Sequence, residues 1–274
     1  MRIAVSHTTH YRFTRPSAHA LQRLHLRPRD SAVQKVIDWT LAVEGGLIEA
    51  GYEDHNQNLT TLVSLLPGAL ELSITCEGTV ETRDCAGVLG AHTGFMPLWV
   101  SRNQTALTEP GAKLRALAAG FATQGAVGLD GLHALADAVR DGVAYEPGHT
   151  DADTTAEAAL AAGRGVCQDH AHIFIGAARA LGVPARYVSG YLLMDDTTQQ
   201  QAGHAWAEAW VPDLGWVGFD VSNAICPDER YIRLAVGVDY RDVAPVTGLV
   251  VGAGDGMVSE LAVNLAVGRS FAEQ

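Results

Sequence analysis

One cysteine in this sequence lies where a thiol can act as a nucleophile. Cys167 follows the glycine-rich segment Gly163-Arg164-Gly165 and begins a stretch with helical spacing. Apolar residues recur after it at intervals of three and four, at Ala171, Phe174, Ala178 and Leu181. The first turn of a helix offers unpaired backbone N–H groups and a partial positive charge, so it favours the thiolate form of Cys167. Gly182 and Pro184 are typical of the end of such a helix.

A nucleophilic thiol also needs a base to accept and return its proton, and a third group to orient that base. The segment GHAWAEAW, residues 203–210, alternates strictly and predicts a strand with His204, Trp206 and Glu208 on one face. After a turn at residues 212–215, residues 216–221 are predicted to return as the second strand of a hairpin. His204 is therefore a candidate general base.

The orienting carboxylate is less sharply defined by the sequence. Asp220 ends the second strand of the predicted hairpin, and an antiparallel hairpin sets residues of neighbouring strands side by side. Asp220 can therefore approach the ring of His204. Asp195, Asp196 and Asp213 are alternative carboxylates, and only the hairpin geometry favours Asp220 over them.

These motifs together resemble the core of the bacterial transglutaminase-like family, whose members are described as candidate cysteine proteases. The resemblance is close over residues 155–225, in the order GRGVCQDHAHIFIGAARALGVPARYVSGYL, GHAWAEAW and GWVGFDVSN. It implies Cys167 as the nucleophile, His204 as base and acid, and Asp220 as the residue that orients His204. Residues 7–36 and 231–252 resemble, more loosely, the N-terminal β region of the family and the segment after its core.

Candidate substrate-binding residues lie beside these motifs. His170 stands where the family usually has an aromatic residue after Cys-Gln-Asp, and it is expected near the cleft together with Gln168. Trp206 and Glu208 share the face of His204 and are candidate cleft residues, although ordinary packing is an equally open interpretation. A Val-Ser-Asn run also replaces the usual Pro-Thr-Asn at residues 221–223. The backbone N–H of Cys167 is the simplest candidate for stabilising an oxyanion.

A metal site is a competing interpretation of Cys167, His170 and His172. On a helix, Cys167 and His170 lie near one another, but His172 points away from both. There is no CxxC pair, and the other cysteines, Cys76, Cys85 and Cys226, are scattered. We expect neither a metal ion nor another cofactor.

The composition limits the classes of partner and the cellular location that we expect for this protein. The chain has 274 residues, 47% of them hydrophobic, and a net charge of −12, with only two lysines, Lys35 and Lys113, among its nineteen basic residues. There is no basic patch to neutralise phosphates, which argues against a nucleic-acid partner. No run of about 20 apolar residues is present, so the sequence predicts neither a membrane partner nor a membrane span. We expect a cytoplasmic protein, in which irregularly spaced cysteines remain reduced; its oligomeric state stays open.

The remaining pattern predicts an α+β fold. Short strands separated by Gly and Pro suggest an antiparallel β domain over residues 1–90, with residues 21–29 as an exposed edge strand. Residues 91–109 form a predicted linker whose Phe95 and Trp99 pack between domains. Residues 110–274 are predicted to form a papain-like, transglutaminase-type catalytic domain, with the cysteine at a helix N-terminus packed on an antiparallel sheet. Its last strands either complete that sheet or return to the β domain.

The predicted activity is thiol-dependent acyl transfer. Hydrolysis of peptide or isopeptide-like amides through a thioester is the preferred function, because the family resemblance points to proteases. Transfer of the acyl group to an amine is the alternative. A non-catalytic binding module on the same fold is a further alternative. Another is an arylamine acetyltransferase, because enzymes of that kind carry a similar triad on a related core.

Overall fold

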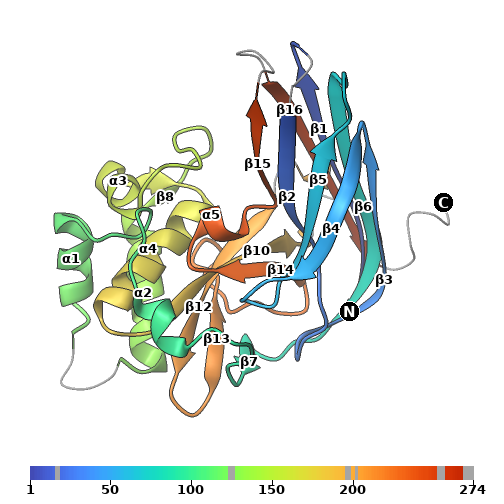
Figure 1. The fold of residues 1–274 in the computed structure, drawn as a ribbon. Coiled ribbons are helices and arrows are strands. Elements are labelled where there is room, and N and C mark those ends of the chain that lie inside the picture. The colour runs from blue at the N-terminus through green and yellow to red at the C-terminus, as the bar shows by residue number, and fades with distance from the viewer. Residues whose placement is uncertain (16–18, 123–126, 195–198, 201–202, 252–256, 268–274) are drawn as a thin grey trace.

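The computed structural model describes residues 1–15, 19–122, 127–194, 199–200, 203–251 and 257–267. A β region and a region of helices packed on a further sheet lie side by side (Figure 1). The helices are α1 (Ala112–Ala119), α2 (Leu129–Gly142), α3 (Ala156–Ala162), α4 (Cys167–Ala180), α5 (Tyr240–Val243) and the 3-10 helix η1 (Leu98–Arg102). None of the helices in these ranges is long and apolar enough to span a membrane.

The strands assemble into sheets that draw on distant parts of the chain. The β region contains β1 (Arg2–Phe13), β2 (His19–Arg27), β3 (Gln34–Glu44), β4 (Gly46–Glu53), β5 (Leu59–Leu65), β6 (Glu71–Thr82), β11 (Gln199–Gln200), β15 (Val246–Val251) and β16 (Met257–Val267). The central sheet contains β7 (Val88–Gly90), β10 (Ala185–Leu192), β12 (His204–Val211), β13 (Gly215–Phe219) and β14 (Tyr231–Gly237). The short strands β8 (Ala144–Tyr145) and β9 (Arg164–Gly165) pair in parallel.

The central sheet is antiparallel and carries α4 on one face. Its strand order is β14-β10-β12-β13-β7. Ala205, Ala207 and Ala209 of β12 are buried in the same core as the apolar residues of α4. Alanine is a poor strand former, but its small side chain lets a helix approach a sheet closely. This close packing explains the alanines of the GHAWAEAW motif and places the start of α4 near the start of β12.

The β region is built from two antiparallel sheets with a common core. Their strand orders are β11-β16-β1-β6-β3 and β15-β2-β5-β4. Ile3, Val5, Leu24, Leu26, Val63 and Ile74 are among the residues buried between them. The predicted fold is therefore confirmed: an α+β structure with a helix-headed cysteine on an antiparallel sheet, preceded by an antiparallel β region.

Both ends of the chain contribute to the β region. β16 pairs with β1 along its length, and β15 pairs with β2. Because β2 lies between β15 and β5, the prediction of an exposed edge strand over residues 21–29 is wrong. Leu24 and Leu26 are fully buried there. The covering strand comes more than two hundred residues later, so no local pattern could reveal it.

The predicted linker, residues 91–109, also packs differently from the expectation. Phe95 is 90% exposed and Trp99 is 61% exposed, so the prediction that they pack between domains is wrong. Just before them, β7 joins the central sheet by pairing with β13. The connection between regions is therefore made by a strand of the sheet and not by a separate apolar linker.

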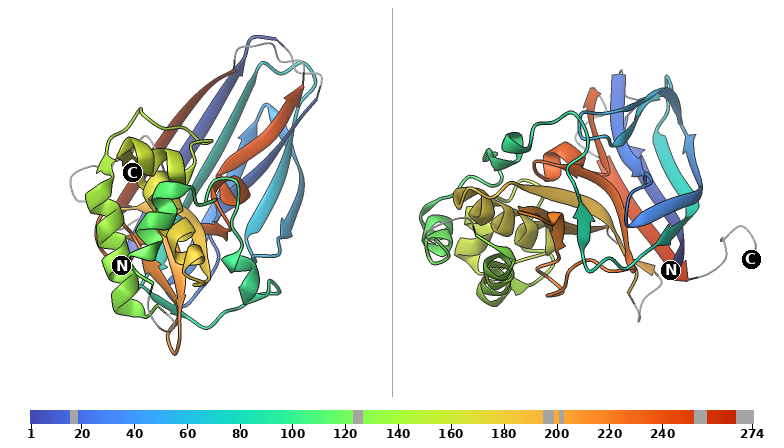
Figure 2. Two further views of the ribbon diagram at one scale, coloured as in Figure 1. Left: turned by 90° about the vertical axis from the view of Figure 1, so that its left-hand side faces the viewer. Right: turned by 90° about the horizontal axis from the view of Figure 1, so that it is seen from below.

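Side chains of the β region cap the free edge of the central sheet. Gln34 exchanges two hydrogen bonds with the backbone of Arg233, each 2.8 Å long. Asn58 does the same with the backbone of Val236, at 2.8 and 2.9 Å. These amides replace the strand that would otherwise satisfy β14. Figure 2 shows the two regions side by side from two further directions.

Candidate active site

Two glycines allow the chain to turn into the helix headed by Cys167. Gly163 ends α3 with a left-handed backbone, φ 69°, which glycine adopts without steric cost. Gly165 lies so near Asp169 that an added Cβ would come within 2.6 Å of its carboxylate oxygen. α4 then begins at Cys167, whose side chain is half-buried. The thiol is therefore accessible from one side at the N-terminus of the helix, as the sequence predicted.

Asp169 holds the turn that precedes the cysteine. Its Oδ2 atom accepts hydrogen bonds from the backbone N–H of Val166, at 2.8 Å, and from the hydroxyl of Thr150, at 2.7 Å. Burial raises the pKa of Asp169, against the effect of these hydrogen bonds. Sequence reasoning did not assign a role to this aspartate. A carboxylate at the third helical position is a common capping arrangement and was the available signal.

His204 and Asp220 meet across the hairpin. His204 begins β12, and Asp220 directly follows β13. The His204 Nε2 atom donates a hydrogen bond to Asp220 Oδ2 at 2.6 Å, and both side chains are buried. Among the alternative carboxylates, Asp213 lies at the β12–β13 turn, and Asp195 and Asp196 fall outside the described residues. The hairpin geometry thus brings together the pair that it predicted.

Asp220 accepts more hydrogen bonds than the one from His204. Its Oδ2 atom also accepts from the hydroxyl of Tyr231, at 2.6 Å, and from the side-chain amide of Asn223, at 2.7 Å. The backbone N–H of Asn223 donates to the other oxygen at 3.2 Å. Burial raises the pKa of Asp220, but the hydrogen bonds and the His204 charge outweigh burial and lower it. Asp220 is therefore held as a carboxylate.

The imidazole of His204 lies between the thiol and this carboxylate. Burial alone lowers the pKa of His204, but hydrogen bonds to Asp220 and to the Cys167 thiol, with the negative charges of both, raise it well above its usual value. Because Nε2 is bonded to Asp220, Nδ1 is the nitrogen left for Cys167. Trp206 stacks on the ring with centroids 6.1 Å apart and fixes its plane. The pKa of His204 responds to both Cys167 and Asp220, so the three predicted triad residues lie within interaction range of one another.

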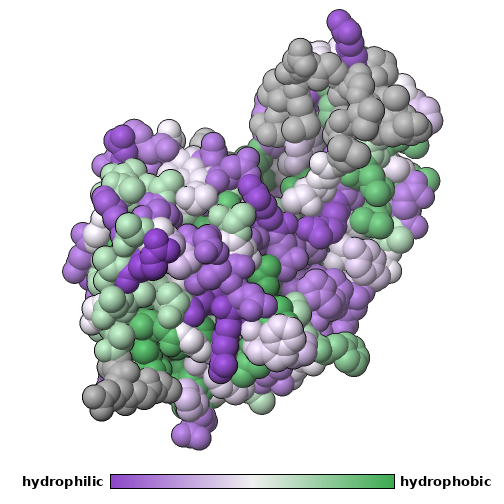
Figure 3. All heavy atoms as spheres, turned by 60° about the vertical axis from the view of Figure 1, so that its left-hand side comes forward, coloured by the Kyte–Doolittle hydropathy of each residue, from purple (hydrophilic) through white to green (hydrophobic). Residues whose placement is uncertain are grey.

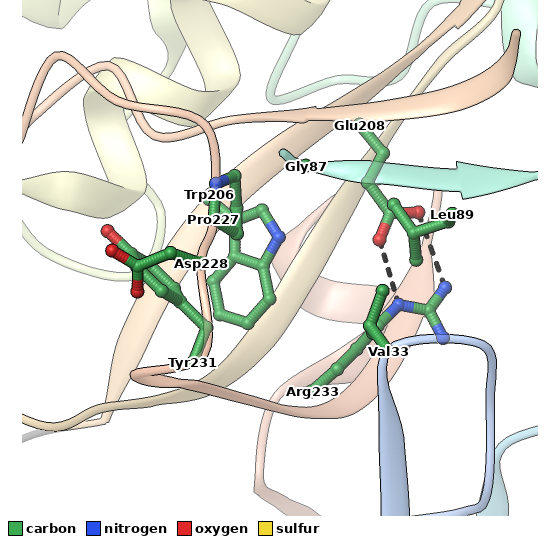
Figure 4. A pocket seen from close by; sticks show the side chains of 9 residues that line it. All are labelled: Val33, Gly87, Leu89, Trp206, Glu208, Pro227, Asp228, Tyr231 and Arg233. Carbon is green, nitrogen blue, oxygen red and sulfur yellow. Dashed lines mark hydrogen bonds and ion pairs between the residues drawn. The ribbon is translucent and has the colours of Figure 1, made fainter. Parts of the chain in front are cut away.

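Two of the predicted substrate-binding residues have structural partners instead. Glu208 is fully buried, and its oxygens are bound by Arg186 at 2.6 Å and by Arg233 at 2.8 Å. Figure 4 shows the pairing with Arg233 beside a small pocket that Trp206 also lines. The expectation that Glu208 is a cleft residue is wrong, because both oxygens are occupied. Trp206 is 3% exposed and serves the packing around His204.

The other two candidates differ from one another. His170 is 1% exposed and is bonded through Nδ1 to the Ser222 hydroxyl and through Nε2 to the carbonyl of Val143. It therefore ties α4 to the segment after Asp220 and does not face the cleft as expected. Burial lowers its pKa, so the ring is neutral. Gln168 is half-buried beside Cys167, and its amide donates to the Asp151 carbonyl at 3.3 Å.

Tyr145 is an exposed aromatic side chain near the nucleophile that the sequence did not single out. Its side chain is 54% exposed, and its ring centroid lies 6.2 Å from that of His170. Its pKa is raised by burial of part of the ring and then by the charges of Cys167 and Asp220. Tyr145 lies on β8, a two-residue strand too short to leave a pattern in the sequence. It is a candidate wall of the cleft.

In the view of Figure 3, the surface is mainly polar where the helical region meets the β region. Within the residues that the structure describes, there is no group of three His, Cys, Asp or Glu side chains that could hold a metal ion. The site itself offers the thiol, the imidazole and the carboxylate, with the backbone N–H groups at the start of α4 as hydrogen-bond donors.

Two family models match the chain. Residues 115–221 match the transglutaminase-like superfamily, and residues 3–81 match the bacterial transglutaminase-like N-terminal region. The first match includes Cys167, His204 and Asp220, and the second covers most of the β region. Each of the two regions is thus similar to a described family.

Individual relatives extend over the full length. An uncharacterised protein of Mycobacterium leprae is 30% identical over 271 residues, covering 92% of this chain and 94% of that protein. A shorter match is to a protein-glutamine gamma-glutamyltransferase of Pseudomonas aeruginosa, 31% identical over an alignment of 119 residues that covers 38% of this chain and 17% of that protein. A solved structure of a candidate cysteine protease from Cytophaga hutchinsonii has a TM-score of 0.77 at 21% identity, covering 99% of this chain and 91% of that one. That likeness shows that the fold is shared.

Proposed function

This chain belongs to the transglutaminase-like superfamily, and from that premise we propose that it is a cysteine peptidase or amidase acting on peptide or isopeptide-like amides. Cys167 is the nucleophile, His204 the general base and acid, and Asp220 the carboxylate that orients His204. The observation that carries this proposal is the buried His204–Asp220 pair, joined at 2.6 Å, whose imidazole interacts with the cysteine at the N-terminus of α4. No further cofactor is required by this chemistry.

In the first half of the reaction, His204 accepts the proton of the Cys167 thiol. The sulfur attacks the carbonyl carbon of the amide, and the oxygen that becomes negative lies against the backbone N–H of Cys167. The C–N bond then breaks while His204 gives its proton to the departing amine. The product of this half is a thioester between the acyl group and Cys167.

In the second half, His204 removes a proton from water, and the resulting hydroxide equivalent attacks the thioester. The C–S bond breaks, the carboxylic acid leaves, and the proton returns to the Cys167–His204 pair. Asp220 keeps its negative charge throughout, because its hydrogen bonds stabilise the carboxylate form. Its role is to hold the imidazole with Nδ1 directed to the sulfur.

Transfer of the acyl group to an amine is the second candidate function. The likeness to a gamma-glutamyltransferase over the core supports it, although the match covers only 17% of that protein. Both functions share the thioester and differ in the nucleophile that resolves it. Incubation with glutamine-containing peptides, with and without a primary amine such as cadaverine, separates them. Free ammonia with a new carboxylate indicates hydrolysis, and amine incorporation indicates transfer.

The proposal is tested by mass spectrometry of the intact protein after brief exposure to a library of peptide esters and amides. The wild type should gain the mass of an acyl group, which digestion should locate on the peptide that contains Cys167. Cys167→Ala should gain no such mass. A protein that forms no acyl adduct with any member, and whose thiol is sluggish, would be a binding module on this fold. Acetylation by acetyl-CoA in place of peptides would instead indicate an acetyltransferase.

We also propose that the protein works in the cytoplasm. All four cysteines are free thiols, and a nucleophilic thiol is preserved best in a reducing compartment. Fractionation of cells expressing the protein at its natural level, followed by immunodetection, tests this location. Recovery from the periplasm would overturn it.

A further inference from the structure

A cavity of about 500 Å³ lies between the central sheet and the loops of the β region. Cys167, His204 and Asp220 do not line it. Its walls come from well-separated parts of the chain and include Arg29, Asn56, Gln57, Arg186, Trp216 and Arg233. A cavity of this size can enclose a small molecule, since ligand pockets commonly measure about 300–1,000 Å³.

The arginines on the sheet side are not neutralised. Arg186 and Arg233 share the single carboxylate of Glu208, with the closest contacts at 2.6 and 2.8 Å. Both arginine side chains are only 14% exposed, and Glu208 is fully buried. Two guanidinium charges and one carboxylate leave an excess of one positive charge in a desolvated place, which is costly without a further anion.

Arg186 also has donors to spare. Its Nε atom binds Glu208, and its guanidinium lies flat on the ring of Trp216, 3.8 Å from the centroid. In the described part of the chain, its two terminal nitrogens have no hydrogen-bond acceptor. Burial lowers the pKa of Arg186 to about 10, and the charge of Glu208 counteracts this effect. The side chain remains charged at neutral pH.

Arg29 adds a third guanidinium from the opposite wall. Its Nη1 atom donates to the backbone carbonyl of Gln57 at 3.1 Å, which supplies no negative charge. The acidic residue on this wall, Asp30, is exposed, and one of its oxygens accepts the backbone N–H of Val36 at 2.8 Å. The cavity is thus a local concentration of positive charge in a chain whose net charge is −12.

We propose that this cavity is a binding site for a small oxyanion, the carboxylate or phosphate group of a small molecule, held by Arg29, Arg186 and Arg233. A planar guanidinium presents paired N–H donors that match the oxygens of either group. The anion supplies the negative charge that Glu208 alone does not. Because the loops of residues 29–32 and 56–57 belong to the β region, the bound anion also joins the two regions of the molecule.

The test is titration calorimetry of the full chain with sodium phosphate, sodium citrate and sodium chloride at matched ionic strength. We expect saturable binding of one phosphate or one citrate, accompanied by a higher unfolding temperature, and no saturable binding of chloride. The oxyanion that saturates distinguishes a phosphate ligand from a carboxylate ligand. Absence of saturable binding by both overturns the proposal.

Arg29→Gln is the diagnostic variant, because Arg29 is half-buried and its hydrogen bond is to a neighbouring loop carbonyl. It should weaken binding about tenfold or more, the usual effect of losing one hydrogen bond to a charged group. The matched control is Arg102→Gln at an exposed arginine outside the cavity, which should bind as the wild type does. Equal affinities of the two variants would place the anion elsewhere. Arg186→Lys keeps the positive charge but loses the paired N–H donors of the guanidinium, so it should weaken binding as well.

Discussion

At the residue scale, the ionisation of His204 depends on how Asp220 is shared among its donors. One carboxylate oxygen accepts from His204, Tyr231 and Asn223 at 2.6 to 2.7 Å. All three hydrogen bonds stabilise the negative charge of Asp220. Those from Tyr231 and Asn223 compete with the imidazole of His204 for the same oxygen. Tyr231 and Asn223 therefore moderate the attraction that Asp220 exerts on the proton of His204.

Tyr231→Phe should reveal this role. Removing the hydroxyl leaves Asp220 a stronger acceptor for His204, so the pKa of His204 should rise and the basic limb of kcat/KM should move to higher pH. The rate should fall severalfold to about a hundredfold, since hydrogen bonds to charged groups contribute about 1.5–3 kcal/mol. The measurement is the pH profile of kcat/KM. Tyr191→Phe is the control, because Tyr191 is a buried tyrosine of the same sheet bonded to His7; a shift of equal size in both variants contradicts the account.

Glu208→Gln should separate a structural role from substrate binding. Loss of the carboxylate leaves two buried guanidiniums without their counterion, so the free energy of unfolding should fall by about 3–5 kcal/mol. Urea denaturation measures this change. KM in the folded fraction should stay unchanged. A raised KM with normal stability would restore Glu208 as a substrate-binding residue. Glu49→Gln, at an exposed carboxylate on β4, is the control.

At the element scale, the helix and hairpin that carry the site were the parts most readily predicted. α4 runs from Cys167 to Ala180, and Gly182 follows it with φ +79°, as the spacing and the terminal glycine predicted. The alternation of residues 204–211 gave β12, and the hairpin placed Asp220 beside His204. These predictions succeeded because each depends on periodicity or on contacts between neighbours in the chain.

The sequence was less informative wherever the partner is distant. From the sequence, Glu208 was a candidate cleft residue, but strand pairing places Arg186 and Arg233 beside it. β2 reads like an edge strand until β15 covers it. Tyr231 reaches Asp220 only because the chain after the hairpin folds back over His204. In each case the deciding contact is set by sheet topology, which leaves no local pattern.

Asn58→Ala tests how the β region is attached to the edge of the central sheet. The substitution removes both hydrogen bonds to the backbone of Val236 and leaves its buried N–H and C=O without partners. We expect the free energy of unfolding to fall by about 1–3 kcal/mol for each unsatisfied group. Denaturation with urea measures it. The exposed Asn103 provides the control, and an equal loss in Asn103→Ala would contradict the capping role.

At the scale of the whole molecule, buried neutral histidines make the stability of the fold sensitive to acid. His7 lies 2% exposed in β1, where it is hydrogen-bonded to Tyr191 of the central sheet at 2.8 Å. Burial lowers the pKa of His7 to about 4 and that of His172, under α5, also to about 4. Both rings are neutral in the folded protein at neutral pH.

The free energy of unfolding should therefore fall as the pH is lowered from about 6.5 towards about 4. In this range the two histidines bind protons in the unfolded chain but remain neutral in the folded protein. The loss for His7 alone is on the order of 3 kcal/mol. Urea denaturation across this range should show a shallower pH dependence in His7→Gln than in the wild type. His149→Gln, at an exposed histidine, is the control. An unchanged slope in His7→Gln would mean that His7 is protonated in the fold.

The most direct test of the account is the rate at which iodoacetamide alkylates Cys167 as a function of pH, followed on its own peptide by mass spectrometry. If His204 activates the thiol, the wild type should react rapidly at neutral pH. His204→Ala should react slowly at neutral pH and gain rate only as the pH is raised. Identical rates and identical pH dependence in the two proteins would contradict the proposed Cys167–His204 pair.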